Sequence, residues 1–325
     1  MRSDAQVRLR PKPRMRLTGA LVCALVLGAP LWPVVAEPDK KSEAQELVDS
    51  RQLDGAEKLI VAEMMTSPRD PDWITLLAEV RLGQNRTAEA LKLIDDANQL
   101  GAPTATRAML ISLAESQAGH MDRAEAPIRN AIQLEPNNAT AHYFYARLLY
   151  TLNRFDESIE ESKKTIELAP DFVRAYENLG LCYEGKYQIE EAERWYLKAI
   201  DRQASSNNKS EWPMLDLATM LIHENRFAEA KPYLMQALEI NPNNTQALLQ
   251  MGTLLEEAGD FKGALDQYRA SIRNDQASQQ PGLASAYYKA ARLCKKLGYS
   301  DEATQDFNRF TALLNKHKNG SVAVP

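Results

Sequence analysis

The sequence predicts an all-α fold, a right-handed α-α superhelix (solenoid) of about eight helix-turn-helix units. Three features of the chain indicate it. A small residue recurs in a common setting along the 325 residues, apolar residues between these positions follow helical spacing, and prolines recur at a fixed distance behind the small residue. A period of this size is typical of repeat proteins, in which each unit buries its apolar face against its neighbours.

The recurring small residue has a period close to 34 residues. It stands at eight positions, namely Ala56, Ala90, Ala124, Ser158, Ala192, Ala230, Ala264 and Ala303. The intervals are 34 residues, except for 38 residues before Ala230 and 39 before Ala303. A small side chain lets two helices approach closely. We expect the extra residues to lengthen the loops at 205–212 and 276–282 without separating domains.

The segments between the small residues have helical periodicity. Residues 139–152 and 173–186 carry apolar side chains at positions i, i+3, i+4 and i+7. Prolines follow four of the small residues at a distance of twelve residues, at Pro68, Pro136, Pro170 and Pro242. Because the residue before a proline is pushed out of the helical region, each of these steps predicts the end of a second helix.

This pattern resembles the tetratricopeptide repeat family, and residues 173–206 match it best. These residues carry Tyr176, Leu179, Gly180 and Tyr183 on the predicted first helix and Ala192, Tyr196 and Ala199 on the second. The resemblance extends from residue 37 to about residue 317. One departure is Ser158, where the family usually has alanine. The resemblance implies a scaffold that holds a segment of a partner protein in its concave groove.

The first 36 residues have the order of a secretory signal peptide. Six basic residues precede an apolar run from Leu17 to Ala36, and small residues at Val34 and Ala36 suit cleavage before Glu37. Met15 is an alternative start that would give a shorter leader. The alternative to cleavage is an inner-membrane anchor formed by residues 17–36.

The domain organisation expected from these features has three parts. Residues 1–36 are the signal peptide, residues 37–317 are the repeat array, and residues 318–325 are a flexible C-terminal tail. We therefore expect an exported protein, located in a bacterial periplasm, whose contact with a membrane is limited to the leader if the leader is not cleaved.

The charge of the chain is divided unevenly between the leader and the array. The full sequence has 39 basic and 44 acidic residues, a net charge of −5, and residues 1–36 hold six of the basic residues and one of the acidic ones. The remaining 33 basic and 43 acidic residues give residues 37–325 a net charge of −10. Nucleic-acid binding usually needs a basic face, so we expect no nucleic-acid partner.

The sequence has no motif for catalysis or metal binding. Its four histidines are scattered, and it has neither a glycine-rich phosphate loop nor a nucleophile elbow. We therefore expect no enzymatic activity, no metal, no cofactor and no small-molecule substrate. Cys182 and Cys294 are interpreted as buried small apolar residues.

The predicted partner-binding groove is lined by the outward stripe of the first helix of each unit. The predicted groove residues are Met109, Leu110, Tyr143, Phe144, Arg147, Tyr150, Arg174, Asn178, Trp212, Lys289 and Arg292. Aromatic and arginine side chains contribute strongly to many protein interfaces. The alternative is that the aromatic residues pack between neighbouring helices and that the basic residues form a solvated face.

The predicted function is a non-catalytic interaction scaffold in the cell envelope that binds a peptide segment or a helix of an envelope protein. Apolar side chains of the partner would contact residues 143–150, and its polar or acidic groups would pair with Arg147 and Arg174. The alternative is an assembly factor for cell-wall or exopolysaccharide machinery that contacts glycan, because tryptophan and tyrosine stripes also suit sugar stacking.

Overall fold

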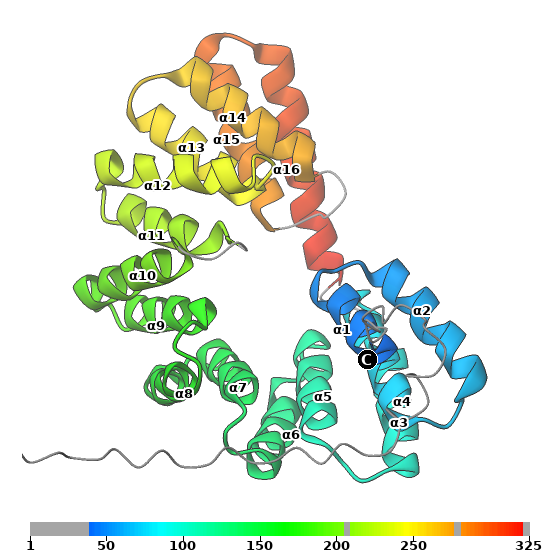
Figure 1. Ribbon diagram of the computed structural model, residues 1–325. Helices are drawn as coiled ribbons and strands as arrows, with labels where there is room; N and C mark the ends of the chain where they lie inside the picture. The colour runs from blue at the N-terminus through cyan, green and yellow to red at the C-terminus, as the bar shows by residue number, and fades with distance from the viewer. Residues whose placement is uncertain (1–38, 205–208, 276–280, 321–325) are drawn as a thin grey trace, which may run out of the picture.

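The computed structural model describes residues 39–204, 209–275 and 281–320, and within these ranges all regular secondary structure is helical (Figure 1). The predicted signal peptide and the last five residues of the predicted tail lie outside the described residues. Helix α16 continues to Gly320, three residues beyond the predicted end of the array.

Sixteen helices follow one another in the described ranges. They are α1 (Lys40–Asp49), α2 (Leu53–Thr66), α3 (Pro71–Gly83), α4 (Thr87–Leu100), α5 (Ala105–Gln117), α6 (Met121–Leu134), α7 (Ala139–Thr151), α8 (Phe155–Leu168), α9 (Val173–Gly185), α10 (Ile189–Ala204), α11 (Trp212–His223), α12 (Phe227–Ile240), α13 (Thr245–Glu257), α14 (Phe261–Asp275), α15 (Pro281–Leu297) and α16 (Ser300–Gly320).

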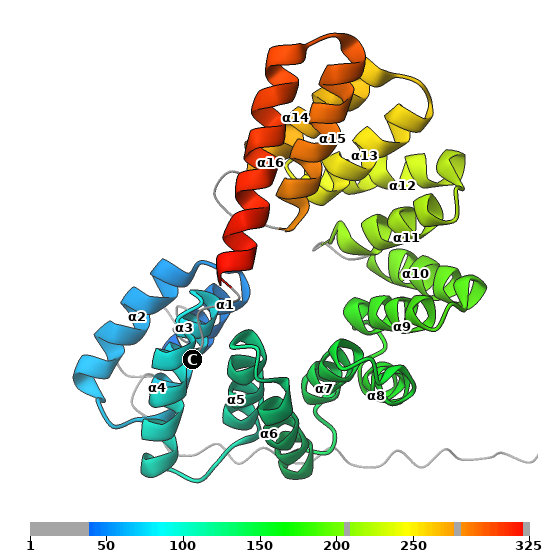
Figure 2. The same cartoon turned by 180° about the vertical axis from the view of Figure 1, so that it is seen from behind.

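Consecutive helices pair into eight hairpins, and each hairpin packs against the next one. The hairpins stack into a curved array, with α5, α7 and α9 on the inner side of the curve and α6, α8 and α10 on its outer side (Figures 1 and 2). The predicted all-α superhelix of eight units is confirmed.

The first interruption of the 34-residue period falls mainly in the connection between α10 and α11. The second mainly lengthens α15, which has 17 residues where α7 and α9 have 13. The loop predicted at 276–282 is therefore wrong at its end, because Pro281 and Gly282 already belong to α15.

The recurring small residues lie where the two helices of a hairpin meet. Seven of the eight are completely buried, and Ala303 is 5% exposed. The side chain one turn later fills the adjoining space, as Tyr196 does against Gly180 and Tyr268 does against Gly252. The 34-residue period of the sequence is therefore the period of the helix-to-helix contacts.

A second periodic feature is the turn inside each hairpin. The residue five positions before the small residue has a positive φ in all eight units, at Arg51, Asn85, Gly119, Asn153, Tyr187, Asn225, Gly259 and Gly298. Glycine and asparagine tolerate this left-handed conformation best, which explains six of the eight residues. Tyr187 is unusual there, and its side chain is 90% exposed.

Ser158 departs from the usual alanine because it belongs to a buried polar cluster. Its Oγ donates a hydrogen bond to the carbonyl oxygen of Ala146 at 2.7 Å. Asn178 Nδ2 donates to Ser158 Oγ at 3.0 Å and to Ser162 Oγ at 2.9 Å. These bonds satisfy polar groups that would otherwise be costly to bury. Cys182 also contacts Ser158, and both Cys182 and Cys294 are free and buried, as expected.

The contact between Gly180 and Tyr196 provides a test of this packing. A Cβ atom at Gly180 would lie 2.4 Å from Tyr196 Cε1. We expect Gly180→Ala to lower the free energy of unfolding by about 1–3 kcal/mol, because the ring must move out of a packed site. Urea unfolding followed by circular dichroism measures the change.

Gly55→Ala is the matched control. Its Cβ would meet side-chain atoms of Leu47 no closer than 3.8 Å, and Gly55 lies inside helix α2. Alanine is the better helix former, so this variant should gain about 0.5–1 kcal/mol. A Gly180→Ala variant that is as stable as Gly55→Ala would contradict the packing described above.

Candidate functional site

The inner face of the array is built from three helical positions that repeat in the third, fourth and fifth hairpins. These positions lie fifteen, eleven and eight residues before the small residue. They carry Met109, Leu113 and Ser116 on α5, Tyr143, Arg147 and Tyr150 on α7, and Glu177, Leu181 and Glu184 on α9. All nine side chains are partly exposed. Residues at this spacing share one face of a helix, so three parallel stripes line the groove.

Helix α7 contributes the aromatic part of the groove. The ring of Tyr143 packs against the rings of Phe144 and Phe172, with centroid distances of 5.7 and 4.9 Å. Tyr150 packs against Phe155 at 5.8 Å. These contacts hold the rings in place while leaving part of each tyrosine exposed. Rigid, partly exposed aromatic side chains are suited to binding because little side-chain entropy is lost when a partner covers them.

A small apolar slot lies between α5 and α7. Its volume is about 110 Å³, and it is lined by Ser112, Leu113, Ser116, Met121, Phe144, Arg147, Leu148 and Thr151. The slot is large enough for one apolar side chain. Phe144 and Arg147, which the sequence pattern placed in the groove, both line this slot.

Arg147 is held by neighbours on the inner face. Its guanidinium lies 5.5 Å from the centre of the Tyr150 ring, and Nη1 lies 3.4 Å from Asn178 Oδ1. Glu177 and Asp216 interact with it electrostatically. Arg147 is therefore a cation surrounded by aromatic and acidic groups. Acidic groups of a partner would require a uniformly basic surface, and the middle of the groove is not one.

The carboxylates of the groove are desolvated. Burial raises the pKa of Glu177, and Arg147 and Arg174 oppose this shift. Burial also raises the pKa of Asp216 well above its usual range, with further contributions from Glu177 and Glu184 and opposition from Arg147. Both side chains are still partly exposed. Protein surrounds them on most sides while solvent still reaches them, as expected at the bottom of a concave surface.

Two predicted groove residues do not line the surface. Leu110 is 7% exposed and belongs to the core around Ala90 and Ile94. Asn178 is completely buried in the polar cluster with Ser158. Both stand fourteen residues before the small residue of their hairpin. That position points toward the preceding hairpin, so their assignment to the groove surface is corrected.

The remaining predicted residues are spread along the array. Met109 is half-buried against the core of the third hairpin, Arg174 is exposed, and Trp212 is 48% exposed at the start of α11. In the eighth hairpin, Lys289 Nζ donates to Thr253 Oγ1 at 3.2 Å, and Arg292 pairs with Glu256. The predicted groove residues Lys289 and Arg292 are thus both engaged by side chains of α13.

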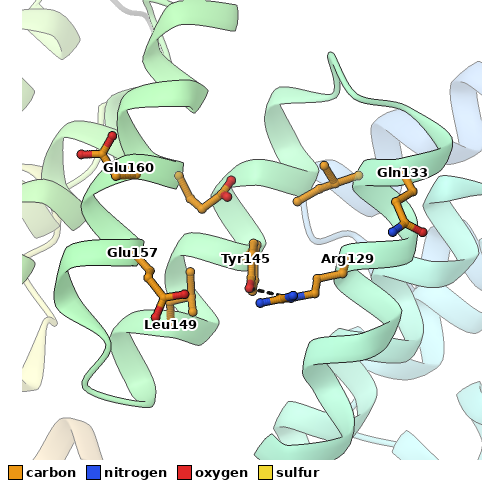
Figure 3. A pocket seen from close by; sticks show the side chains of 8 residues that line it. Arg129, Gln133, Tyr145, Leu149, Glu157 and Glu160 are labelled. Carbon is orange, nitrogen blue, oxygen red and sulfur yellow. Dashed lines mark hydrogen bonds between the residues drawn. The ribbon is translucent and has the colours of Figure 1, made fainter.

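The outer side of the array also has a cavity, of about 430 Å³ between α6 and α8 (Figure 3). Arg129 Nε donates to the Tyr145 hydroxyl at 2.8 Å there. The carboxylates around it are already paired. Glu157 binds Arg154 at 2.5 Å, Glu160 binds Lys163 at 3.1 Å, and Glu161 lies 2.6 Å from His142 Nδ1. The outer cavity therefore offers less unsatisfied charge than the inner face.

The described residues include no group of three or more histidine, cysteine or acidic side chains placed to hold a metal ion. Within the same ranges, no helix is both long enough and apolar enough to cross a lipid bilayer. The apolar run at 17–36 lies outside the described residues.

Repeated helical hairpins with a partly exposed inner face are typical of helical-repeat scaffolds. The chain matches one tetratricopeptide repeat model at residues 116–179 and 221–280, and a second at residues 173–206 and 284–313. Together these matches cover more than half of the 325 residues. The chain belongs to the tetratricopeptide repeat family, as the sequence pattern indicated.

Relatives with different roles share this repeat. The chain is 21% identical to the protein CTR9 homolog of Arabidopsis thaliana, over 83% of this chain and 30% of that protein. It is 26% identical to the type IV pilus assembly protein PilF of Pseudomonas aeruginosa, over 49% of this chain and 62% of that protein. It thus spans under two thirds of the length of either relative.

The solved structure of Pseudomonas aeruginosa pilF has a similar fold. Its TM-score is 0.54 at 20% identity, and the match covers 65% of this chain and 95% of that one. The likeness shows the same helical solenoid architecture.

The raised pKa of Asp216 predicts a pH-dependent loss of stability. An acid whose pKa is raised on folding binds its proton more tightly in the folded state. The folded protein therefore loses stability as the pH rises from the usual aspartate pKa of 3.8 toward the raised value. Asp216→Asn removes this loss, and we expect its Tm to exceed that of the wild type by about 2 °C or more at pH 8.

Thermal unfolding from pH 4 to pH 8 measures the effect, and the difference in Tm should shrink toward pH 4. Asp201→Asn is the control, because Asp201 is exposed on α10. A constant difference in Tm at every pH would show that the Asp216 carboxylate is not the cause.

Proposed function

We propose that this chain is a non-catalytic scaffold that binds a peptide segment or a helix of a partner protein in its concave groove. The observation that supports it is the inner face of α5, α7, α9 and α11. There, half-buried tyrosines adjoin an apolar slot and carboxylates whose charge is incompletely balanced. A partner segment that covers this face would bury aromatic area and supply the missing polar contacts, the usual composition of a binding hot spot.

We also propose that the protein acts in the cell envelope after export. The leader-like order of residues 1–36 supports export. The relative named as a type IV pilus assembly protein supports an envelope role, since pilus assembly takes place there. The partner would then be a protein of an envelope complex.

The groove can be tested by removing its aromatic surface. The variants Tyr143→Ala and Tyr150→Ala each delete a partly exposed ring and should weaken partner binding about tenfold or more, because hot-spot truncations cost about 2 kcal/mol or more. Cross-linking in intact cells, followed by mass spectrometry of the captured proteins, identifies the partner, and titration with that partner gives the Kd.

Tyr299→Ala is the control for this experiment, because Tyr299 is 45% exposed in the turn before α16. Circular dichroism verifies that all variants fold. If the groove variants and the control bind the same partner equally well, the groove is not the binding surface.

The proposed export has a direct test at the N-terminus. Mass spectrometry of the protein purified from the envelope fraction should find Glu37 as its first residue. Replacing Ala36 with Gln should block cleavage, because the signal peptidase site needs a small residue. A purified protein that retains residues 17–36 would instead support the anchored form.

A further inference from the structure

Two facing helices form a crevice next to the tyrosines of α7. Helix α9 contributes Glu177, Leu181 and Glu184, at the spacing i, i+4 and i+7. Helix α11 contributes Asp216 and Met220, and the Asp216 carboxylate interacts with those of Glu177 and Glu184. We refer to this region between α9 and α11 as the acidic crevice.

The acidic crevice opens into a cavity of about 320 Å³. The cavity is lined by Tyr150, Leu181, Glu184, Gly185, Tyr187, Ile189, Met220, His223 and Glu224. Its walls are partly apolar and its polar groups include two carboxylates. A long side chain with an apolar stem and a cationic head combines both properties, since lysine and arginine bury their methylene groups while the charge stays near polar groups.

The carboxylates of Glu177 and Asp216 interact electrostatically with arginines but form no direct ion pair with them. In the described part of the chain, the side chains of Glu177, Asp216 and Glu224 form no ion pair and no hydrogen bond. Glu184 accepts one hydrogen bond, from the Tyr196 hydroxyl at 2.7 Å. By contrast, the outer-side residues Glu125 and Glu193 both bind arginines.

The basic residues on neighbouring helices do not neutralise the negative charge of the crevice. Arg147 approaches from α7, where it is stacked on Tyr150, and Arg174 lies one turn before Glu177 on α9. His223 lines the cavity from α11. Four carboxylates thus face two guanidinium groups. Burial raises the pKa of both Glu177 and Asp216, which agrees with an incomplete set of cations.

Aromatic side chains flank the same cavity. Tyr150 lies on its α7 side, and Tyr187 projects from the turn after α9 with 90% of its side chain exposed. Partly exposed aromatic rings at the edge of a cavity are suited to contact with a cationic side chain. A bound metal ion would instead need several oxygen ligands gathered around one point, and the described residues hold no such group.

We propose that the acidic crevice receives a lysine or arginine side chain of the partner segment, while an apolar side chain of the same segment occupies the slot between α5 and α7. This inference rests on the proposed function, because it names the chemistry of the segment that the groove binds. The groove then selects a segment that carries both one apolar residue and one basic residue. Which of the two comes first in the sequence of the segment depends on the direction in which its chain runs along the groove.

Synthetic peptides of defined composition test the inference directly. The probes are extended fluorescent peptides of about twelve residues, a length that spans about 40 Å at 3.3 Å per residue. Each contains one Phe and one Lys in a Ser-Gly background, and the distance and order of the two residues vary across the set. Matched peptides carry norleucine or Glu in place of Lys. Fluorescence anisotropy with the purified full chain gives each Kd.

We expect some spacings of the Phe-Lys peptides to bind at least tenfold more tightly than their norleucine or Glu counterparts. The double variant Glu184→Gln, Asp216→Asn should remove this preference while keeping the contribution of Phe. Asp216→Lys should shift the preference toward Glu. Glu160→Gln is the control, because Glu160 lies on the outer side with a 73% exposed side chain. Binding should be unchanged by EDTA.

Each result separates the two proposals. If Lys and norleucine peptides bind equally well, or if the double variant keeps the preference for Lys, the acidic crevice is not a site for a cation, while the groove remains a binding surface. If the Glu peptides bind more tightly than the Lys peptides and EDTA abolishes that difference, a metal ion occupies the crevice and the inference is overturned. If no peptide of the set binds, the crevice proposal fails, and the groove proposal is decided separately by the Tyr143→Ala and Tyr150→Ala variants with the captured partner.

Discussion

The close approach of two helices at one small side chain makes the whole array possible. Seven of the eight recurring small residues are completely buried. At each, the absence of a large side chain allows the second helix to lie against the first, and in the fifth and seventh hairpins Tyr196 and Tyr268 fill the remaining space one turn later. Because every hairpin uses the same contact, the hairpins stack in the same way and their first helices align on one inner face.

The outer turns and the inner face of the middle hairpins differ in how their charged groups are paired. On the outer side, arginines of the turns pair with glutamates of their own and the preceding hairpin, as Arg154 does with Glu157 and Glu125. On the inner side, the fourth to sixth hairpins leave tyrosines and carboxylates partly exposed. Satisfied charges fit a solvated surface, whereas incompletely paired groups at the bottom of a groove are suited to contacts with a partner.

The departures from the regular repeat have local physical reasons. Ser158 replaces alanine because its hydroxyl bonds to Ala146 and accepts from Asn178 across the hairpin boundary. Tyr187 occupies a left-handed turn position where glycine or asparagine would cost less. Its exposed ring gives it no packing role that would compensate, and it borders the cavity between α9 and α11. Such an exception is a reason to test a position for function.

The period, the helical hairpins and the longer connection before α11 could be predicted from the amino-acid sequence, because they depend on local spacing and on small residues and prolines. The extra residues before Ala303, predicted as a loop, mainly lengthen α15, since spacing alone does not show whether an insertion extends a helix or a loop. The same spacing located Tyr143, Arg147 and Tyr150 on the inner face.

The spacing did not reveal which neighbouring positions remain accessible to solvent. Leu110, Phe144, Asn178 and Asp216 all stand fourteen residues before a small residue. Leu110 and Asn178 are buried, while Phe144 and Asp216 remain partly exposed. The packing of whole hairpins sets this difference, since exposure at this position depends on side chains of the preceding hairpin, which the spacing within one repeat does not encode.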